Sequence, residues 1–285
     1  MGINRKRTVE DWIFDTINHI IMILVFITML YPIIYVFSCS VSDPHFVQRQ
    51  EIFLFPKGFS LDSYIFLFKN SDILKYFRNS IFYTAFGTFI SICLTVCGAF
   101  VLSHKNFSCR NFFMMMITFT MYFSGGLIPL FLLITKLKLY NTIWAILLPS
   151  AISTMNIIIT RSFFKSIPEA LIQSAEIDNA NDFQVLFYII LPLSAPIVAV
   201  LILFYAVARW NSYFDAMIYT PNPDLHPLQL YLVRILVENN SQSNALLNAP
   251  MVNSKSLTSI QLKYSAIITT IMPIVCLYPF LQKYL

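Results

Sequence analysis

The chain has 285 residues, of which 57% are hydrophobic, 16% aromatic and only 12% charged, and its formal net charge at pH 7 is +5. Together with a mean hydropathy of +0.68, this composition lies outside that of water-soluble globular domains and indicates a lipid bilayer as the solvent.

Six stretches of the sequence contain no Asp, Glu, Lys or Arg. Each is close to the ~20 residues that an α-helix needs to cross ~30 Å of hydrocarbon. We therefore expect an all-α membrane protein whose residues 1–285 form a single domain. Its six spans are expected at about 16–42, 79–104, 111–135, 139–160, 183–208 and 264–282.

The first span follows Arg5, Lys6 and Arg7. Its apolar run is longer than that of a signal peptide and no cleavage site closes it, so we expect it to stay in the chain. The positive-inside rule gives most weight to short loops and to the first helix, and the loops 43–78 and 209–263 are long. Both termini are therefore predicted to be cytoplasmic.

The third span contains Ser124, Gly125 and Gly126, followed by Pro129. These residues should interrupt the helical hydrogen bonds. Open backbone at membrane depth is tolerated where protein or water covers it, which suggests that this break lines a pathway through the membrane. A kink for close helix packing is the alternative, because small residues also bring helices together.

Residues 166–182 hold four of the 14 acidic residues. Ser166 and Glu169 fit a capping box, so a helix should begin near Ile167. The helix then presents a narrow face of mostly small residues that could lie against another surface, formed by Leu171, Ser174, Ala175 and Asp178.

Asn179 should end this helix in the left-handed conformation. Asn181 or Asp182 can then cap the next helix, which runs into the fifth span. The segment is predicted to be helix, turn and helix at the membrane surface.

The outer end of the fifth span combines aromatic rings with hydrogen-bonding groups. Such a set suits a pyranose, which has an apolar ring face and equatorial hydroxyls. An aromatic belt at the lipid headgroups is the alternative. The residues concerned are Tyr205, Arg209, Trp210, Asn211 and Tyr213.

Enzymatic chemistry is not predicted. The sequence contains no G-x-x-x-x-G-K-[ST] loop for a nucleotide, and its four histidines have no metal-ligand spacing. We expect no cofactor, metal site or nucleic-acid partner for this chain. One functional interpretation, kept as the alternative, is an ion-coupled secondary sugar transporter. Such a transporter normally needs acidic residues within the membrane, and the acid that could serve is Asp215, just past the fifth span.

The segment 173–192 resembles the EAA loop of binding-protein-dependent ABC importer permeases, whose pattern is Glu-Ala-Ala, then Asp-Gly-Ala, then Ile-x-Leu-Pro. Here the matching positions are Gln173, Ser174, Ala175, Asp178, Asn179, Ala180, Ile190, Leu191 and Pro192. The stretches "LYPIIYVFSCSVSDP", "TMYFSGGLIPLFLL", "FYAVARWNSYFDAMIY" and "LYPFLQKYL" extend the resemblance. Together they are similar to the second permease subunit of carbohydrate importers, in the branch for complex oligosaccharides.

Three positions depart from the family pattern, namely Gln173 for Glu, Ser174 for Ala and Asn179 for Gly. Asn keeps access to positive φ, so the shape is retained better than the charge. The chain stops at Leu285, before the family's basic tail, and the resemblance does not extend to a tail contact with the ATPase.

The resemblance implies a type I importer permease in the bacterial plasma membrane. Its loop, with Glu169, would dock into a cleft of an ATPase subunit, although Asp178 could act only as a cap and Ala175 only as a small helix former. The implied partners are a second homologous permease, two ATPase subunits that bind ATP and Mg, an extracellular solute-binding (lipo)protein, an oligosaccharide and membrane lipid.

Overall fold

The computed structural model describes residues 9–69, 71–104, 107–246 and 254–282. Helices dominate this part of the chain, and its one β-feature is an isolated bridge between Ser42 and Phe59. The predicted all-α class is confirmed. The chain divides into two compact units, one of Met1–Lys69 and Ile235–Thr269 and the other of Asn70–Arg234 and Thr270–Leu285, where the sequence predicted a single domain.

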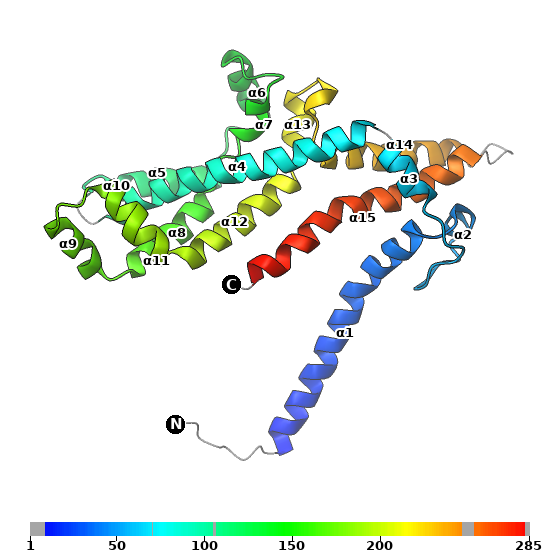
Figure 1. The fold of residues 1–285 in the computed structure, drawn as a ribbon, viewed down its shortest axis with the longest axis horizontal. Helices are drawn as coiled ribbons and strands as arrows, with labels where there is room; N and C mark the ends of the chain where they lie inside the picture. The colour runs from blue at the N-terminus through cyan, green and yellow to red at the C-terminus, as the bar shows by residue number, and fades with distance from the viewer. Residues whose placement is uncertain (1–8, 70, 105–106, 247–253, 283–285) are drawn as a thin grey trace. The chain divides into compact units, whose positions relative to one another are not determined.

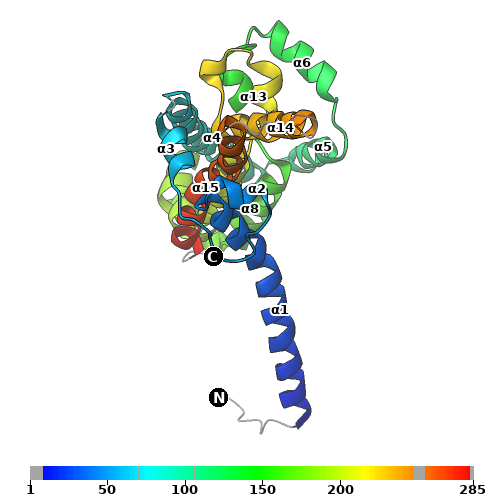
Figure 2. The same ribbon diagram turned by 90° about the vertical axis from the view of Figure 1, so that its right-hand side faces the viewer.

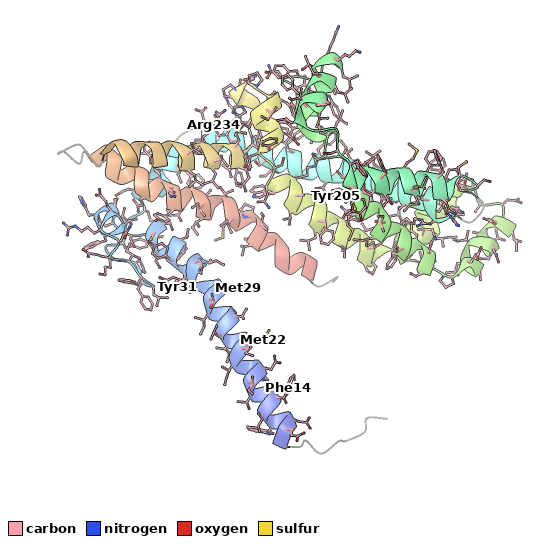
Figure 3. All side chains as sticks on the ribbon, turned by 180° about the vertical axis from the view of Figure 1, so that it is seen from behind. Phe14, Met22, Met29, Tyr31, Tyr205 and Arg234 are labelled. Atoms are coloured by element: carbon pink, nitrogen blue, oxygen red, sulfur yellow. The ribbon has the colours of Figure 1, made fainter. Side chains whose placement is uncertain are left out.

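The first unit is built on α1 (Val9–Ser40), with α2 (Pro44–Gln48), α3 (Asp62–Lys69) and the adjoining parts of α14 (Leu228–Leu246) and α15 (Ser254–Gln282). The most apolar window of α1 has no buried residue. Figure 3 shows its side chains, among them Phe14, Met22 and Met29, projecting from all around the helix. An apolar helix that is exposed on all sides suits a lipid environment, in agreement with the predicted first span.

The carboxyl end of α1 is closed by polar contacts within this unit. Gln261 Nε2 donates to the carbonyl oxygens of Ser42 at 2.7 Å and Ser40 at 3.3 Å, and the Tyr64 hydroxyl donates to Ser40 Oγ at 2.8 Å. The last carbonyls of a helix lack intrahelical partners. Gln261 therefore fixes the start of α15 to the end of α1.

The second unit is centred on α4 (Ser71–Ser103), α8 (Thr154–Ser166) and α12 (Ala195–Trp210), which pack side by side (Figure 1). Their shared core includes Val96, Phe100, Phe164 and Leu201. The other elements of the unit are α5 (Arg110–Tyr122), α6 (Leu127–Lys136), α7 (Ile143–Leu147), α9 (Glu169–Ile177), α10 (Asp182–Gln184), η1 (Val185–Ile190), α11 (Leu191–Leu193), α13 (Phe214–Tyr219), η2 (Pro223–Leu225) and the adjoining parts of α14 and α15.

A smaller apolar cluster joins α6, α7 and α13 through Ile134, Ala145 and Tyr219. Figure 2 shows α6 and α13 on one side of the unit, and Figure 1 shows α7 beside them. The backbone N–H of Asn141 donates to the Tyr219 carbonyl at 2.8 Å, which ties the turn before α7 to the end of α13.

Two described helical segments, Glu10–Ser40 and Asp72–Ser103, are long and apolar enough to cross a membrane. The number rises to four if each of two bent pairs forms one span: Arg110–Tyr122 with Leu127–Lys136, bent by 115°, and Asp182–Leu193 with Ala195–Trp210, bent by 84°. The predicted spans 111–135 and 183–208 are therefore broken rather than straight.

The predicted span 139–160 is not one helix either, because α7 and α8 are separated by residues 148–153. Pro149 offers no N–H to continue α7. Ser153 has an extended conformation, and its hydroxyl accepts from the backbone N–H of Asn156 at 3.4 Å, which begins a new helix. The predicted span 264–282 forms the last part of α15, which begins earlier, at Ser254.

Candidate functional site

The helix of the 166–182 segment, α9, begins later than predicted. α8 continues to Ser166, whose hydroxyl donates back to the Phe163 carbonyl at 2.7 Å. Pro168 occupies the N-cap of α9 and provides no side-chain cap. The predicted capping box of Ser166 and Glu169 is thus wrong, because Ser166 belongs to the last turn of the preceding helix.

The end of α9 follows the prediction. Asn179 has a φ of 56°, in the left-handed region, directly after Asp178 at the C-cap. Asn181 Oδ1 then accepts from the Gln184 N–H at 2.9 Å, and Gln184 Oε1 accepts from the Asn181 N–H at 2.8 Å. This reciprocal capping box starts α10, so Asn181 and not Asp182 is the cap.

The packing of α9 divides the predicted small-residue face. Ala175 is only 8% exposed and lies in the core formed with α4, α8 and α12. Leu171, Ser174 and Asp178 are exposed. Ala175 therefore anchors α9 to its own chain, whereas the other three residues of that face stay accessible.

Ile177 is an exposed residue of α9 that the sequence analysis missed. Its side chain is 82% exposed. Gln173, Ser174 and Asn179 are exposed as well. The sequence signal for this exposure is helical spacing: residues 170, 173, 174 and 177 lie on the side of the helix away from Ala175. Outside the membrane, an isoleucine so exposed is a candidate contact for another protein.

The helical chain beyond α9 contains Leu191 and Pro192 and bends sharply just after them. Residues Val185–Ile190 form a π-helix, Leu191 packs against the core and Pro192 is exposed. Proline removes a helical hydrogen bond, and π-helical turns often accompany such breaks. The 84° bend follows at Ser194, between Leu193 and Ala195, so α9 and α12 are joined by a bent connection.

The second predicted site, at Ser124, Gly125 and Gly126, lies between α5 and α6. The three residues are exposed and non-helical, as predicted, and Gly126 has a φ of 84°. A positive φ of this kind suits glycine. Whether this break lines a transport path stays a prediction.

The predicted aromatic group at the end of α12 is divided among different contacts. The Tyr205 hydroxyl, labelled in Figure 3, accepts from the Ser153 N–H at 3.2 Å and lies 2.6 Å from Thr95 Oγ1. Trp210 Nε1 donates to the Thr270 carbonyl at 3.0 Å. Both side chains are buried, so they serve the packing of unit 2.

Arg209 is also buried, with an exposed fraction of 6%. Its guanidinium donates to the carbonyls of Ile146 at 3.0 Å and Leu147 at 2.8 Å. These are the last residues of α7, whose carbonyls lack helical partners. Asp215 is close enough for its carboxylate to interact with this guanidinium, although burial still raises the pKa of Asp215.

Asn211 and Tyr213 are the two exposed members of the group. Asn211 Nδ2 donates to the Val207 carbonyl at 2.9 Å, and its Oδ1 accepts from Gln229 Nε2 at 3.1 Å. Of the five predicted residues, these two are accessible and the other three are buried.

Comparisons with known proteins match most of the chain. Residues 95–285 match the family described as "Binding-protein-dependent transport system inner membrane component". The "Polygalacturonan/rhamnogalacturonan transport system permease protein YtcP" of Bacillus subtilis (strain 168) is 34% identical over 275 residues, which cover 96% of each chain. The "Arabinooligosaccharides transport system permease protein AraQ" of Halalkalibacterium halodurans is 25% identical and covers 80% of this chain and 77% of its own.

A solved structure gives the same picture. It is described as the crystal structure of a bacterial ABC transporter involved in the import of the acidic polysaccharide alginate. The matching chain has 34% sequence identity and a TM-score of 0.87, and the match covers 99% of both chains. The similarity therefore includes both units of the present chain.

Proposed function

The chain belongs to the family of binding-protein-dependent transport system inner membrane components, and we propose from this membership that it is a permease subunit of an ABC importer for oligosaccharides. It is a multi-pass membrane permease and not an enzyme. The energy for transport would come from ATP hydrolysis in a separate subunit.

The observation that carries the proposal is the construction of α9. Its buried side, at Ala175, packs against η1 and belongs to the core that η1 shares with α4, α8 and α12. Its other side exposes Gln173, Ser174 and Ile177. A short helix held in this way can transmit a force without bending, which suits a loop that docks into a cleft of an ATPase subunit and moves with it.

We further propose that Glu169, Asp178, Asn179 and Ala180 complete this coupling segment. Asp178 and Asn179 are exposed at the end of α9 and Ala180 is partly buried. Leu191 and Pro192 would pass the motion to α12 through the bend. The partners would be two ATPase subunits that bind ATP and Mg, a second homologous permease and an extracellular solute-binding (lipo)protein.

The proposed topology has six crossings and cytoplasmic termini. α1 and α4 supply two crossings, the bent pairs α5–α6 and α10–α12 two more, and α7–α8 and α15 the remaining two. The breaks in three of these crossings are compatible with a membrane permease, because irregular backbone is tolerated where protein or a water-filled path covers it.

The proposed transport path passes Ser124, Gly125 and Gly126 and the exposed pair Asn211 and Tyr213. Tyr205, Arg209 and Trp210 would hold this region in place. A phenol ring and an amide suit the apolar face and the hydroxyls of a sugar. Because two of the similar proteins are named for polygalacturonan and for an acidic polysaccharide, oligosaccharides that contain acidic sugars are the first substrates to test.

The test is reconstitution. A tagged chain purified in mild detergent should bring down a second permease and an ATPase. The complex in proteoliposomes should then hydrolyse ATP faster when the binding protein is loaded with an acidic oligosaccharide than when it is empty. Proteoliposomes with this chain alone should be inert.

The ion-coupled alternative predicts the opposite pattern. Sugar uptake by the lone chain down a gradient would contradict the proposal. Uptake in cells that stops when the proton gradient is dissipated, while ATP stays high, would contradict it as well.

A further inference from the structure

A polar pocket of about 690 Å³ lies where the end of α4, the start of α5, the end of α8 and the whole of α9 meet within unit 2. The wall made by the first three helices carries Ser103, His104, Arg110, Lys165 and Ser166. Glu169 and Glu176 lie on the α9 wall. The proposed transport path does not use this pocket, and of the residues proposed for coupling only Glu169 and Gln173 line it.

Positive charges are crowded at this pocket. Burial lowers the pKa of Lys165, and the charges of Arg161 and Arg110 lower it further. Burial and the charge of Arg110 likewise lower the pKa of Arg161, whose Nε donates to the Leu102 carbonyl at 2.9 Å. Arg110 and Lys165, which line the pocket, thus repel each other and the neighbouring Arg161, and an anion in the pocket would lower this cost.

Two nitrogen atoms at the pocket lack partners. Arg110 Nε and His104 Nε2 are buried and make no hydrogen bond with the described part of the chain. A buried polar atom without a partner costs free energy. A ligand with several acceptor oxygens would satisfy Arg110 Nε, and His104 Nε2 too when that nitrogen carries the proton.

Arg110 is also the first residue of α5, and the N-cap residue, Cys109, provides no side-chain cap. A cation at a helix amino terminus opposes the helix dipole, whereas an anion there is favourable. The start of α5 therefore adds to the preference for negative charge.

We propose that this pocket binds a phosphate group, carried by a soluble phosphorylated molecule or by a lipid headgroup. Phosphate offers more charge and more acceptor oxygens than a carboxylate, and arginine and lysine are its usual side-chain partners. The hydroxyl oxygens of Ser103 and Ser166, which donate to carbonyls of their own helices, can accept from a protonated phosphate oxygen.

Occupancy would affect α9. A phosphate at Arg110 and Lys165 repels the carboxylates of Glu169 and Glu176, and Gln173 lines the pocket as well as being exposed. The ligand would thereby shift the position of the helix that we propose to contact the ATPase. This consequence rests on the proposed function, whereas binding itself depends only on the residues of the pocket.

The experiment measures thermal unfolding of the purified complex. One arm compares inorganic phosphate with chloride at equal ionic strength in detergent. The other compares nanodiscs of phosphatidylcholine alone with nanodiscs that also contain phosphatidylglycerol. A rise in the unfolding temperature with free phosphate identifies a soluble ligand, and a rise only with phosphatidylglycerol identifies a lipid. No rise in either arm overturns the proposal.

Variants locate the effect. The double variant Arg110→Gln with Lys165→Gln should weaken phosphate binding, measured through the rise in unfolding temperature, by about tenfold or more. This is the factor expected when charge-assisted hydrogen bonds are lost. The control Arg49→Gln removes an exposed arginine, whose Nη1 lies 4.0 Å from Glu51 Oε1, and should leave the response intact. An equal response in the double variant and the control contradicts the proposal.

A second variant covers the case in which the double variant does not fold. Ser166→Asp places a carboxylate beside the cations, so it should raise the unfolding temperature in phosphate-free buffer and abolish the response to phosphate. A lower unfolding temperature with an undiminished response would contradict the proposal.

Discussion

Ile177 and Ala175 are two residues apart on α9 but occupy opposite environments. Successive residues of an α-helix are rotated by about 100°, so a pair two apart faces nearly opposite directions. Ala175 is 8% exposed in the core and Ile177 is 82% exposed. The two residues thus allow the stability of the chain to be tested separately from its contact with an ATPase.

Replacing Ile177 with Ser should leave the free energy of unfolding within about 0.5 kcal/mol of the wild type, as for most surface substitutions. The same change should weaken retention of the ATPase by about fivefold or more, if Ile177 is an interface anchor worth ~1 kcal/mol or above. Thermal unfolding measures the stability and co-purification measures the retention of the ATPase. The control Ile177→Val keeps a branched apolar side chain and should retain the ATPase as the wild type does.

The comparison variant is Ala175→Trp. It overfills a packed core and should destabilise the chain by about 1–3 kcal/mol or more, with loss of the ATPase only as a consequence. If Ile177→Ser lowered the unfolding temperature as much as Ala175→Trp, Ile177 would be a packing residue of the chain itself.

Arg209 gives a second prediction at this scale. Replacement by Ala leaves the carbonyls of Ile146 and Leu147 without a donor, at about 1–3 kcal/mol for each buried group. Lysine cannot reproduce the two-pronged donation, so Arg209→Lys should also lower the unfolding temperature. An Arg209→Ala chain with wild-type stability but no stimulation by sugar would instead mark Arg209 as a substrate contact.

At the scale of the elements, the break between α5 and α6 depends on one backbone conformation. Gly126 has a φ of 84° and a Cβ there would meet no atom within 4 Å, whereas a Cβ on Gly125 would meet only Pro129 Cβ, at 3.9 Å. Both sites thus have room for a methyl group. They differ because, of the two glycines, only Gly126 has a left-handed φ.

Gly126→Ala should therefore cost about 1–2 kcal/mol of backbone strain, and Gly125→Ala should cost less. Thermal unfolding of the two purified variants measures the difference, and transport by the reconstituted complex shows whether the break matters for function. Equal stability of the two variants would mean that the break can adopt another conformation.

The segment 220–228 is held on α4 by residues that recur every fourth position. Lys75 Nζ pairs with Asp224 Oδ1 at 2.6 Å, Asn79 Nδ2 donates to the Asp224 carbonyl at 2.7 Å, and the Tyr83 hydroxyl donates to the Leu225 carbonyl at 2.9 Å. His226, 2% exposed, lies 2.8 Å through Nε2 from the Thr220 carbonyl. The regular spacing makes one face of α4 a support for this segment.

Acid should weaken this support. Burial, and the charge of Arg234, lower the pKa of His226 below its ordinary value of 6.5. The folded chain therefore binds this proton less readily than the unfolded chain. The contribution of His226 to stability is fully present above about pH 6.5 and is lost as the pH falls from there through the lower folded pKa.

Between pH 7.5 and pH 5, the unfolding temperature should therefore fall less steeply for His226→Gln than for the wild type. The free energy of unfolding that the wild type loses through His226 is about 1.4 kcal/mol for each unit by which its folded and unfolded pKa values differ. Tyr76, Arg234 and Asp224 are the other groups near this ring or its segment and stay unchanged. His45→Gln, at an exposed site, is the control. Identical slopes for all three chains would exclude His226 as the cause.

At the scale of the whole molecule, the sequence predicted best what depends on neighbouring residues. Runs without charge located α1 and α4, the Gly-Gly pair located the break before α6, and Asn179 and Asn181 located the turn after α9. These features depend on hydrophobicity and backbone preference within a few residues.

Features that depend on distant residues were missed or misread. The donors of Arg209 reach carbonyls more than sixty positions away in the sequence, and Ala175 is buried in a core that combines the nearby η1 with residues of α4, α8 and α12. A pattern of neighbouring residues predicts neither contact. Pro149 and Ser153 do indicate the split of 139–160 into α7 and α8, but the absence of charge over the whole run predicted one continuous span.

The bent pair α5–α6 leaves the topology open to a direct test, because two helices at 115° could cross the membrane together or return to the side they came from. Single cysteines at Phe55, Leu137 and Asn179 in a cysteine-free background distinguish the two arrangements, since all three positions are exposed. With six crossings, Phe55 and Leu137 lie outside and Asn179 lies inside. An impermeant maleimide should then label Phe55→Cys and Leu137→Cys in intact cells, and Asn179→Cys only after lysis. If α5–α6 re-enters instead, Leu137→Cys is protected in intact cells while Phe55→Cys is labelled, and the six-crossing arrangement fails at its third crossing.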